Sequence, residues 1–187
     1  MPQLLSIEHA EQDAMLALSR ATLMHHWQRQ EPTPSVTLPH GQLLVPCFVT
    51  LQKAGELRGC IGCLEARMPL IQAIPYFSLA AAFSDPRFAP LAQDELPQIR
   101  IHLSLLGNLS PLPAHSRDAL LAALIPGEDG LKLQDAHHQS TFLPSVWEQL
   151  PDPGDFVDQL LRKGGWSSHW PSQLQAWRYP SLSFGEE

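Results

Sequence analysis

The chain has 187 residues, of which 44% are hydrophobic and 17% are charged, and its formal net charge is −7. This length and composition are typical of a single globular domain with a sizeable core, and the acidic excess argues against general nucleic-acid binding, which needs cations that neutralise phosphates. No apolar stretch of signal length opens the chain and none approaches the ~20 residues of a membrane span, so we expect a cytoplasmic protein.

The first predicted element is an N-terminal helix that Ser6 can cap. Its apolar side recurs at helical spacing and consists of Ile7, Ala10, Ala14, Leu18 and Ala21. The segment QEPTPSVTLPHGQ ends this helix, because proline lacks the N–H group that a helix needs. We therefore divide a single domain into residues 1–42, a helix with a Pro-rich connector over 31–42, and residues 43–187, the core.

A β-hairpin is predicted directly after the connector. PCFVTLQ (46–52) has the composition of a strand, and KAGE provides a turn in which Gly55 can take a positive φ. LRGCIG (57–62) then returns as the second strand, which places Cys60 near the end of that strand.

The pattern then predicts a helix, a loop and a strand. Apolar residues at helical spacing cover residues 69–81, although Pro75 should kink or restart this helix. FSDPRFAPLAQDEL follows as a loop with a short turn. In IRIHLSLL (99–106) apolar residues alternate with other residues, which is the period of a strand with one buried face.

The C-terminal part begins with a second hairpin, GLKLQDAHHQSTFLP, whose tip lies between Ala136 and Gln139, and PSVWEQL follows as a short helix. Asp155 can cap a helix over FVDQLLRK, which Gly164 and Gly165 stop. LQAWRYPSLSF closes the chain as a strand or an extended tail. Because two hairpins require antiparallel pairing, the predicted class is α+β, with an antiparallel β-sheet flanked by helices.

Cys60 is the first candidate for chemistry. Gly59 and Gly62 remove side chains on both sides of it, as happens where a ligand or another backbone comes close. In the functional interpretation, backbone N–H groups around the glycines favour a nucleophilic thiolate. In the structural interpretation, Cys60 is a small buried hydrophobe.

Cys60 and Cys63 form a C-x-x-C spacing, which in other proteins marks redox exchange or half of a zinc site. Here there is no second such pair, and this one ends a strand, whereas a redox C-x-x-C normally opens a helix. Cys47 lies on the facing strand at a register that the sequence does not fix. We therefore expect neither a metal nor a cofactor, and the question of a disulfide between Cys60 and Cys63 stays open.

Two further features are candidates for the site. His102, on the non-core face of its strand beside Ser104, is the best candidate for a base near Cys60, and a satisfied surface histidine is the alternative. The segment SDPRF (84–88) predicts an Asx-type turn at Asp85. The same segment offers Arg87, whose planar guanidinium can grip a carboxylate or phosphate at two points.

Four segments, in this order and spacing, resemble the AMMECR family, whose bacterial and archaeal members are called AmmeMemoRadiSam system protein A. They are CFVTLQKAGELRGCIGCLEARMPL, AAFSDPRFAPLAQDELPQIRIHLSLL, GLKLQDAHHQSTFLPSVWEQLPDP and LLRKGG. The family motif falls on the LRGCIG hexapeptide and on Asp85, Arg87, Phe88, Leu143 and Pro144, and Ser104 falls where the family usually has serine. Two positions depart from the pattern: Cys63 replaces a typical threonine, and His102 is not reliably histidine.

The resemblance implies a compact α+β domain of two unequal lobes, with the LRGCIG segment lining a cleft that is a possible active site. It also implies partners, because members of the family are part of a three-part system with a Memo-type protein and a radical-SAM protein. No settled reaction comes with the family. The residues that the resemblance and the patterns together assign to binding are Arg58, Gly59, Gly62, Asp85, Arg87 and Ser104.

Two hypotheses about function follow from these observations. In the first, the chain is an enzyme or accessory in which Cys60 is the nucleophile or redox centre and Arg58 or Arg87 orients an anionic small molecule or protein segment. In the second, it is a non-catalytic adaptor that docks on the Memo-type or radical-SAM partner. The adaptor hypothesis rests on the tryptophans of the C-terminal third, since aromatic residues are enriched at interface hot spots; these are Trp147, Trp166, Trp170 and Trp177.

Overall fold

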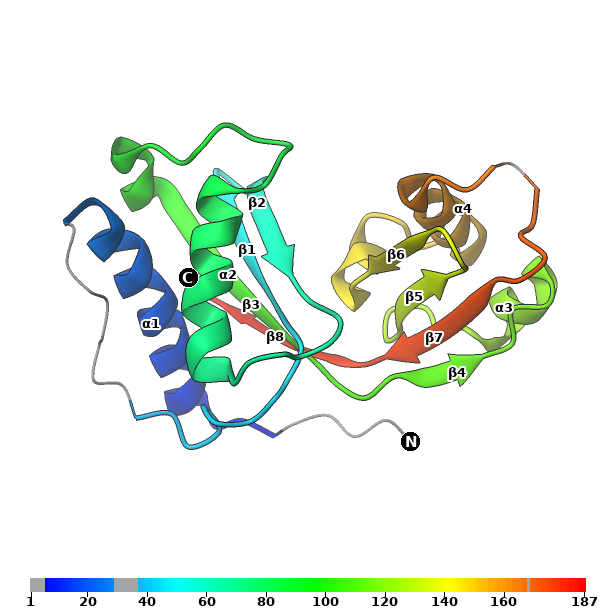
Figure 1. Ribbon diagram of the computed structural model, residues 1–187, viewed down its shortest axis with the longest axis horizontal. Coiled ribbons are helices and arrows are strands. Elements are labelled where there is room, and N and C mark those ends of the chain that lie inside the picture. Colours follow the sequence, from blue (N-terminus) through cyan, green and yellow to red (C-terminus); the bar gives the residue numbers. More distant parts are fainter. Residues whose placement is uncertain (1–5, 29–36, 168) are drawn as a thin grey trace. The chain divides into compact units, whose positions relative to one another are not determined.

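The computed structural model describes residues 6–28, 37–167 and 169–187, so the connector predicted over 31–42 lies partly outside the described residues. The chain forms two compact units, each with its own four-stranded sheet and hydrophobic core (Figure 1). Among the described residues, the N-terminal unit comprises 6–28, 37–106 and 182–187, and the C-terminal unit comprises 107–167 and 169–181. Helices combined with antiparallel pairing confirm the predicted α+β class.

Within the described residues, no helix has the length and apolar character needed to cross a membrane.

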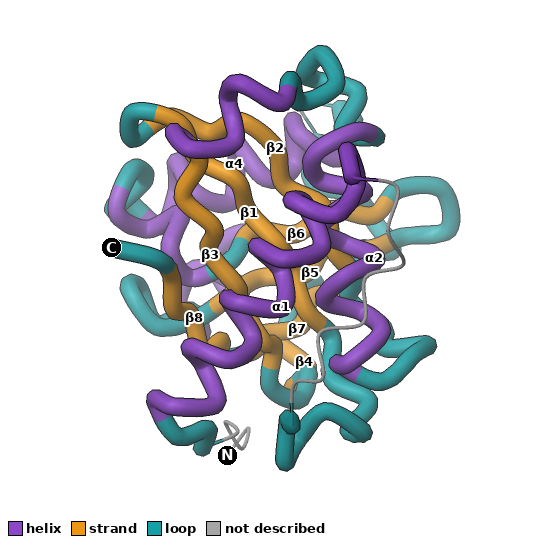
Figure 2. The backbone as a smooth tube through the Cα atoms, turned by 90° about the vertical axis from the view of Figure 1, so that its left-hand side faces the viewer, coloured by secondary structure: helices purple, strands orange, loops and turns teal. Residues whose placement is uncertain are grey.

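The sheet of the N-terminal unit has the strand order β2-β1-β3-β8. The elements of this unit are α1 His9–Gln28, β1 Cys47–Lys53, β2 Glu56–Gly62, α2 Leu70–Phe83, η1 Gln93–Gln98, β3 Ile99–Leu106 and β8 Ser181–Gly185. Figure 2 shows α1 and α2 lying over the same face of this sheet. That face buries alternate residues of the strands, among them Val49 and Leu51 of β1 and Ile101 and Leu103 of β3, as predicted for IRIHLSLL.

The first hairpin forms as the sequence predicts. Its turn places Ala54 and Gly55 at φ values of 53° and 82°, and two positive φ values suit the right-handed twist of the paired strands. Two helix predictions need correction. The first helix begins at His9, so Ser6 is not its cap. Of the predicted kink or restart at Pro75, the restart is wrong, because α2 runs through Pro75 as one element. Pro75 removes one backbone hydrogen bond, which the burial of the apolar face of α2 outweighs.

The glycines beside Cys60 are required by neighbouring backbone. A Cβ atom at Gly59 would lie 2.2 Å from the carbonyl oxygen of Ala81, so α2 approaches β2 at a distance that only glycine allows. A Cβ atom at Gly62 would lie 2.3 Å from the carbonyl oxygen of Cys47 on the neighbouring strand. Close packing therefore accounts for both glycines without a ligand.

The C-terminal unit has the strand order β4-β7-β5-β6. Its elements are β4 Ser110–Leu112, α3 Arg117–Ala123, β5 Gly130–Gln134, β6 Gln139–Phe142, η2 Pro144–Glu148, α4 Pro153–Gly164 and β7 Gln175–Tyr179. In its core the indole of Trp147 stacks on the ring of Phe156, with centroids 3.8 Å apart and planes 1° from parallel. The predicted second hairpin is present as β5 and β6, and the predicted short helix as η2.

Three features of the C-terminal part differ from the prediction. Asp152, not Asp155, caps α4: the helix begins at Pro153, which suits the first helical turn, and the Asp152 carboxylate accepts the N–H of Asp155. The last segment contains two strands, because Pro180 separates β7 of one sheet from β8 of the other. The helix α3, which Ser116 caps, was not predicted.

The close approach of α2 to β2 predicts that Gly59→Ala destabilises the N-terminal unit. The added methyl group meets backbone rather than a movable side chain, so we expect the free energy of unfolding to fall by about 2–3 kcal/mol in denaturant titration. Gly55→Ala is the matched control, since its Cβ meets nothing within 4 Å and only the φ of 82° costs about 1 kcal/mol. Equal losses for the two variants would contradict the steric explanation.

Candidate functional site

Cys60 lies on the face of the N-terminal sheet that α1 and α2 do not cover. Its neighbour Gly59 faces α2, and successive residues of a strand point to opposite faces, so the Cys60 side chain points away from the helices. Thr50 is its register partner on β1, and the Thr50 hydroxyl donates a hydrogen bond to Cys60 Sγ at 3.2 Å. A hydroxyl that donates to sulfur favours the thiolate form over the thiol.

A buried carboxylate joins the Cys60 backbone to Arg87. Asp85 Oδ2 accepts the N–H of Cys60 at 2.9 Å and Arg87 Nη2 at 2.7 Å. Asp85 Oδ1 accepts the backbone N–H of Arg87 at 3.1 Å and Nε at 3.0 Å, which completes the predicted Asx-type turn. The hydrogen bond from Arg87, above all, lowers the pKa of Asp85 to about 2, with smaller contributions from the N–H groups of Cys60 and Arg87.

The guanidinium of Arg87 is held at one edge and exposed at the other. Its side chain is 51% exposed, whereas that of Asp85 is 2% exposed. Asp85 and, at 3.4 Å, the carbonyl oxygen of Cys60 engage the Nε and Nη2 hydrogens, so an anion would meet the Nη1 side. The pKa of Arg87 is raised by the hydrogen bond to Asp85 and, less strongly, by the charges of Asp85 and Cys60. A fixed, solvent-accessible cation therefore lies next to the thiol-bearing residue.

Arg58, the other cationic candidate, is committed to an internal ion pair. Its Nε and Nη2 donate to the two carboxylate oxygens of Glu95 at 3.1 and 2.8 Å, and only 15% of its side chain is exposed. Lys53 donates to the same carboxylate at 2.9 Å. The hydrogen bond from Arg58 is the main reason that the pKa of Glu95 falls to about 2. Arg58 thus anchors the segment before β3 to the hairpin, and its charge is compensated there.

The structure separates the predicted base from Cys60. Thr50 is the register partner of both Cys60 and His102, so one whole strand lies between these two residues. Two strand spacings place their Cα atoms about 10 Å apart. The His102 ring packs against Gly185 of β8, since a Cβ atom added at Gly185 would lie 2.2 Å from His102 Nδ1. Strand β8 lies on the side of β3 that faces away from Cys60. Ser104, two residues further on, shares a hydrogen bond of 2.9 Å with Ser183.

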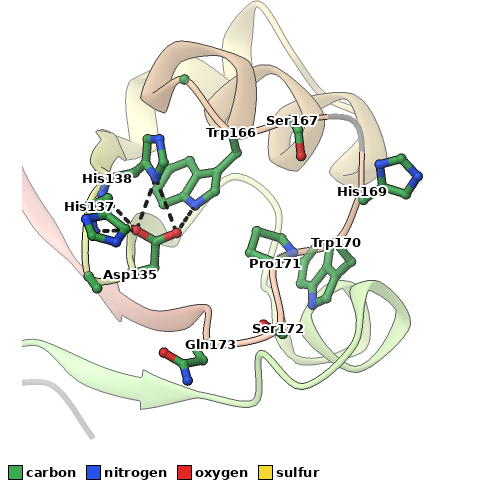
Figure 3. Close-up of a pocket in the computed structure, with 12 residues that line it drawn as sticks. Asp135, His137, His138, Trp166, Ser167, His169, Trp170, Pro171, Ser172 and Gln173 are labelled. Atoms are coloured by element: carbon green, nitrogen blue, oxygen red, sulfur yellow. Dashed lines mark hydrogen bonds and ion pairs between the residues drawn. The ribbon is translucent and has the colours of Figure 1, made fainter.

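The C-terminal unit contains a hollow that the sequence analysis did not predict (Figure 3). Its volume is about 480 Å³, and it is lined by the loop between β5 and β6 and by the loop that follows α4. Asp135 organises the first loop: its carboxylate accepts the N–H groups of His137 and His138 at 2.8 and 2.7 Å and the indole N–H of Trp166 at 2.5 Å. These donors, led by the N–H of His137, lower the pKa of Asp135.

The lining of this hollow comes from two separate loops, so no local motif could have indicated it. The two adjacent histidines have rings at 89° to each other, and His138 Nδ1 lies 3.2 Å from Asp135 Oδ1. His137 is exposed, whereas His138 is partly buried and takes part in the hydrogen bonding of the loop. Across the described ranges, no group of three or more His, Cys, Asp or Glu side chains is placed to hold a metal ion.

Comparison with known proteins finds one matching family and several relatives of this chain. The sequence profile of the AMMECR1 family matches residues 16–184. A protein of Methanothermobacter thermautotrophicus is 32% identical over 143 residues, which cover 75% of this chain and 74% of that protein. A protein of Aeropyrum pernix is 39% identical over 105 residues, 53% of this chain, and the match spans only 44% of that relative's length.

A solved structure has the same fold. The crystal structure of the uncharacterized protein PH0010 from Pyrococcus horikoshii superposes with a TM-score of 0.87, over 97% of this chain and 94% of that one. The two sequences are 23% identical, so the likeness concerns the fold. It supports the α+β architecture that the helices and sheets establish.

The Asp85 contacts predict a pH-dependent contribution to stability. A carboxyl group whose pKa is lowered on folding stabilises the protein above its unfolded pKa of ~3.9, and this contribution is lost as the pH falls through the folded value of about 2. We expect Asp85→Asn to lower the free energy of unfolding by about 2 kcal/mol at pH 7 and by much less at pH 2. The exposed Asp94→Asn is the control, and a loss of the same size at both pH values would refute the electrostatic account.

Proposed function

This chain belongs to the AMMECR1 family, and from that premise we propose that it is a thiol-dependent component of an AmmeMemoRadiSam-type system in which Cys60 acts on an anionic small molecule. One observation carries the proposal: the buried Asp85 carboxylate binds the Cys60 backbone and the Arg87 guanidinium together. The cation is therefore fixed beside the residue that bears the thiol, and it is half exposed to incoming anions.

In the proposed mechanism, each residue has a separate task. The Cys60 thiol loses its proton to solvent, and the hydrogen bond from Thr50 together with the charge of Arg87 favours the thiolate. The Nη1 side of Arg87 then binds a carboxylate or phosphate of the substrate. Cys60 Sγ forms a bond to an electrophilic carbon, and the leaving group departs with the electron pair of the bond that breaks. His102 has no part in this scheme.

A binding role without covalent chemistry is the rival function. In the adaptor hypothesis the chain docks on a Memo-type or radical-SAM partner, and Cys60 and Arg87 are surface features of no chemical consequence. Trp147, one of the tryptophans behind that hypothesis, lies in the core of the C-terminal unit, and the indole N–H groups of Trp147 and Trp170 donate to backbone carbonyls of that unit. These contacts explain both residues as packing, so the thiol-centred function has the stronger support.

One prediction of this proposal concerns the reactivity of Cys60 in the native protein. We expect iodoacetamide to alkylate Cys60 below the pH of ~8.5 at which an ordinary cysteine ionises, with each cysteine followed separately by mass spectrometry. Arg87→Gln removes the neighbouring cation and should slow alkylation at pH 7 by about three- to tenfold. Arg162→Gln removes an exposed cation from α4 and is the matched control. If Cys60 reacts only after unfolding, the thiol-centred function is wrong and partner binding becomes the working hypothesis.

A second prediction separates Thr50 from His102. Thr50→Val keeps the shape of the side chain but removes the hydroxyl, so alkylation of Cys60 should slow by about fivefold, equivalent to about 1 kcal/mol for one hydrogen bond. His102→Ala should leave the rate unchanged, because one whole strand lies between His102 and Cys60. A slower rate for His102→Ala, with the Thr50→Val rate unaltered, would restore His102 as the base.

A further inference from the structure

We propose that Cys47 and Cys63 are a redox pair that closes a cross-strand disulfide at the open end of the β1–β2 hairpin. In the structure all three cysteines are thiols. The pair that the structure brings together is not the C-x-x-C pair of the sequence. The proposal concerns the other side of the sheet from the Cys60 site and does not depend on that site's function.

The register of the hairpin places the two residues opposite each other. Phe48 pairs with Gly62, so the next position outward pairs Cys47 with Cys63. The N–H of Cys63 donates to the carbonyl oxygen of Cys47 at 3.0 Å, which is one of the two hydrogen bonds of a hydrogen-bonded antiparallel pair. The Cα atoms of such a pair are about 5.5 Å apart, within the range of about 4.4–6.8 Å that disulfides span.

Both side chains lie on the core side of the sheet. Cys47 has no exposed surface and belongs to the core beneath α1 and α2, and Cys63 packs against that same core while it remains partly exposed. The charge of Cys63 contributes to the raised pKa of Cys47, as expected for neighbouring sulfur atoms. Cys60 precedes Cys63 by three residues and points to the opposite face, so a disulfide between Cys60 and Cys63 does not fit this hairpin.

The more exposed of the two cysteines reacts first with a small disulfide such as oxidised glutathione. The more accessible Cys63 thiolate attacks one sulfur of the small disulfide, a mixed disulfide forms, and one small thiolate leaves. Cys47 then attacks Cys63 Sγ, the protein disulfide forms, and the second small thiolate leaves. The two protein thiols are oxidised, the small disulfide is reduced to two thiols, and these take up the two protons that the protein releases.

The second step should be slow at neutral pH and faster in alkali. Burial, and after it the charge of Cys63, raises the pKa of Cys47 to about 12, so little of its thiolate exists at pH 7. A hydrogen-bonded pair holds its Cβ atoms slightly farther apart than an unstrained disulfide prefers, and strain makes a disulfide easier to reduce. The pair therefore suits reversible oxidation better than a permanent structural bond.

The test is oxidation of the native protein with excess oxidised glutathione at pH 7 and pH 9, followed by quenching in denaturant. We expect the thiols of Cys47 and Cys63 to be lost to one internal bond, more rapidly at pH 9, whereas the reactive Cys60 forms a mixed disulfide with glutathione. Dithiothreitol should restore all three thiols. Peptide mass spectrometry should then find Cys47 joined to Cys63 with the loss of two hydrogen atoms. A Cys60–Cys63 bond, or glutathione that stays on Cys63 at both pH values, would overturn the proposal.

Two variants test which cysteines form the internal bond. Cys60→Ser should still lose two thiols, whereas Cys63→Thr, which replaces the more exposed partner, should lose none by internal bonding. If Cys63→Thr fails to fold, the cross-linked peptide from the unmodified protein decides the question alone. Failure here is distinguishable from failure of the proposed function, because alkylation of Cys60 is measured at a different residue and without an oxidant.

Discussion

The contact between the end of α2 and the middle of β2 is the constraint on which the site depends. At Gly59 the Ala81 carbonyl comes so close that no side chain fits, and two residues beyond α2 the Asp85 carboxylate accepts the N–H of Cys60. These two contacts fall on consecutive residues of β2. The Ala81 carbonyl occupies the space where a side chain of Gly59 would lie, and the Asp85 carboxylate binds the backbone N–H of Cys60. Helix packing therefore fixes where the carboxylate lies, and the carboxylate fixes where Arg87 lies.

Two carboxylate–guanidinium pairs hold the segment between α2 and β3, and they differ in how far the guanidinium is exposed to solvent. Glu95 binds Arg58 and Lys53, and the Arg58 side chain is only 15% exposed, so that pair closes on itself. Asp85 is the more deeply buried acid, yet its partner Arg87 is the more exposed base. The buried Asp85 carboxylate holds the guanidinium of Arg87 from one side, so the cation is fixed in position and still open to solvent. Recognition of an anion requires such a fixed cation.

The sequence predicted the features that are local and failed where a distant contact decides. Alternation predicted the buried face of β3, and a glycine in the turn predicted the first hairpin. It left open whether Gly59 makes room for a ligand or for another backbone, because the answer lies in Ala81 on another element. It gave His102 as a base because strand patterning shows which face a residue occupies but not how many strands lie between two residues; Thr50, which occupies that position, carried no signal of its own.

The same limitation explains why the C-x-x-C spacing was uninformative. On a helix, residues three apart share a face, so two thiols at this spacing can react with each other or with one metal. On a strand, three residues reverse the direction of the side chain, and the two sulfurs belong to different environments. Cys60 faces Thr50 across the sheet, and Cys63 faces Cys47 beside the core. The pairing that matters is set by the hairpin register, which a turn of two residues at Ala54 and Gly55 and a bulge after Leu51 determine together.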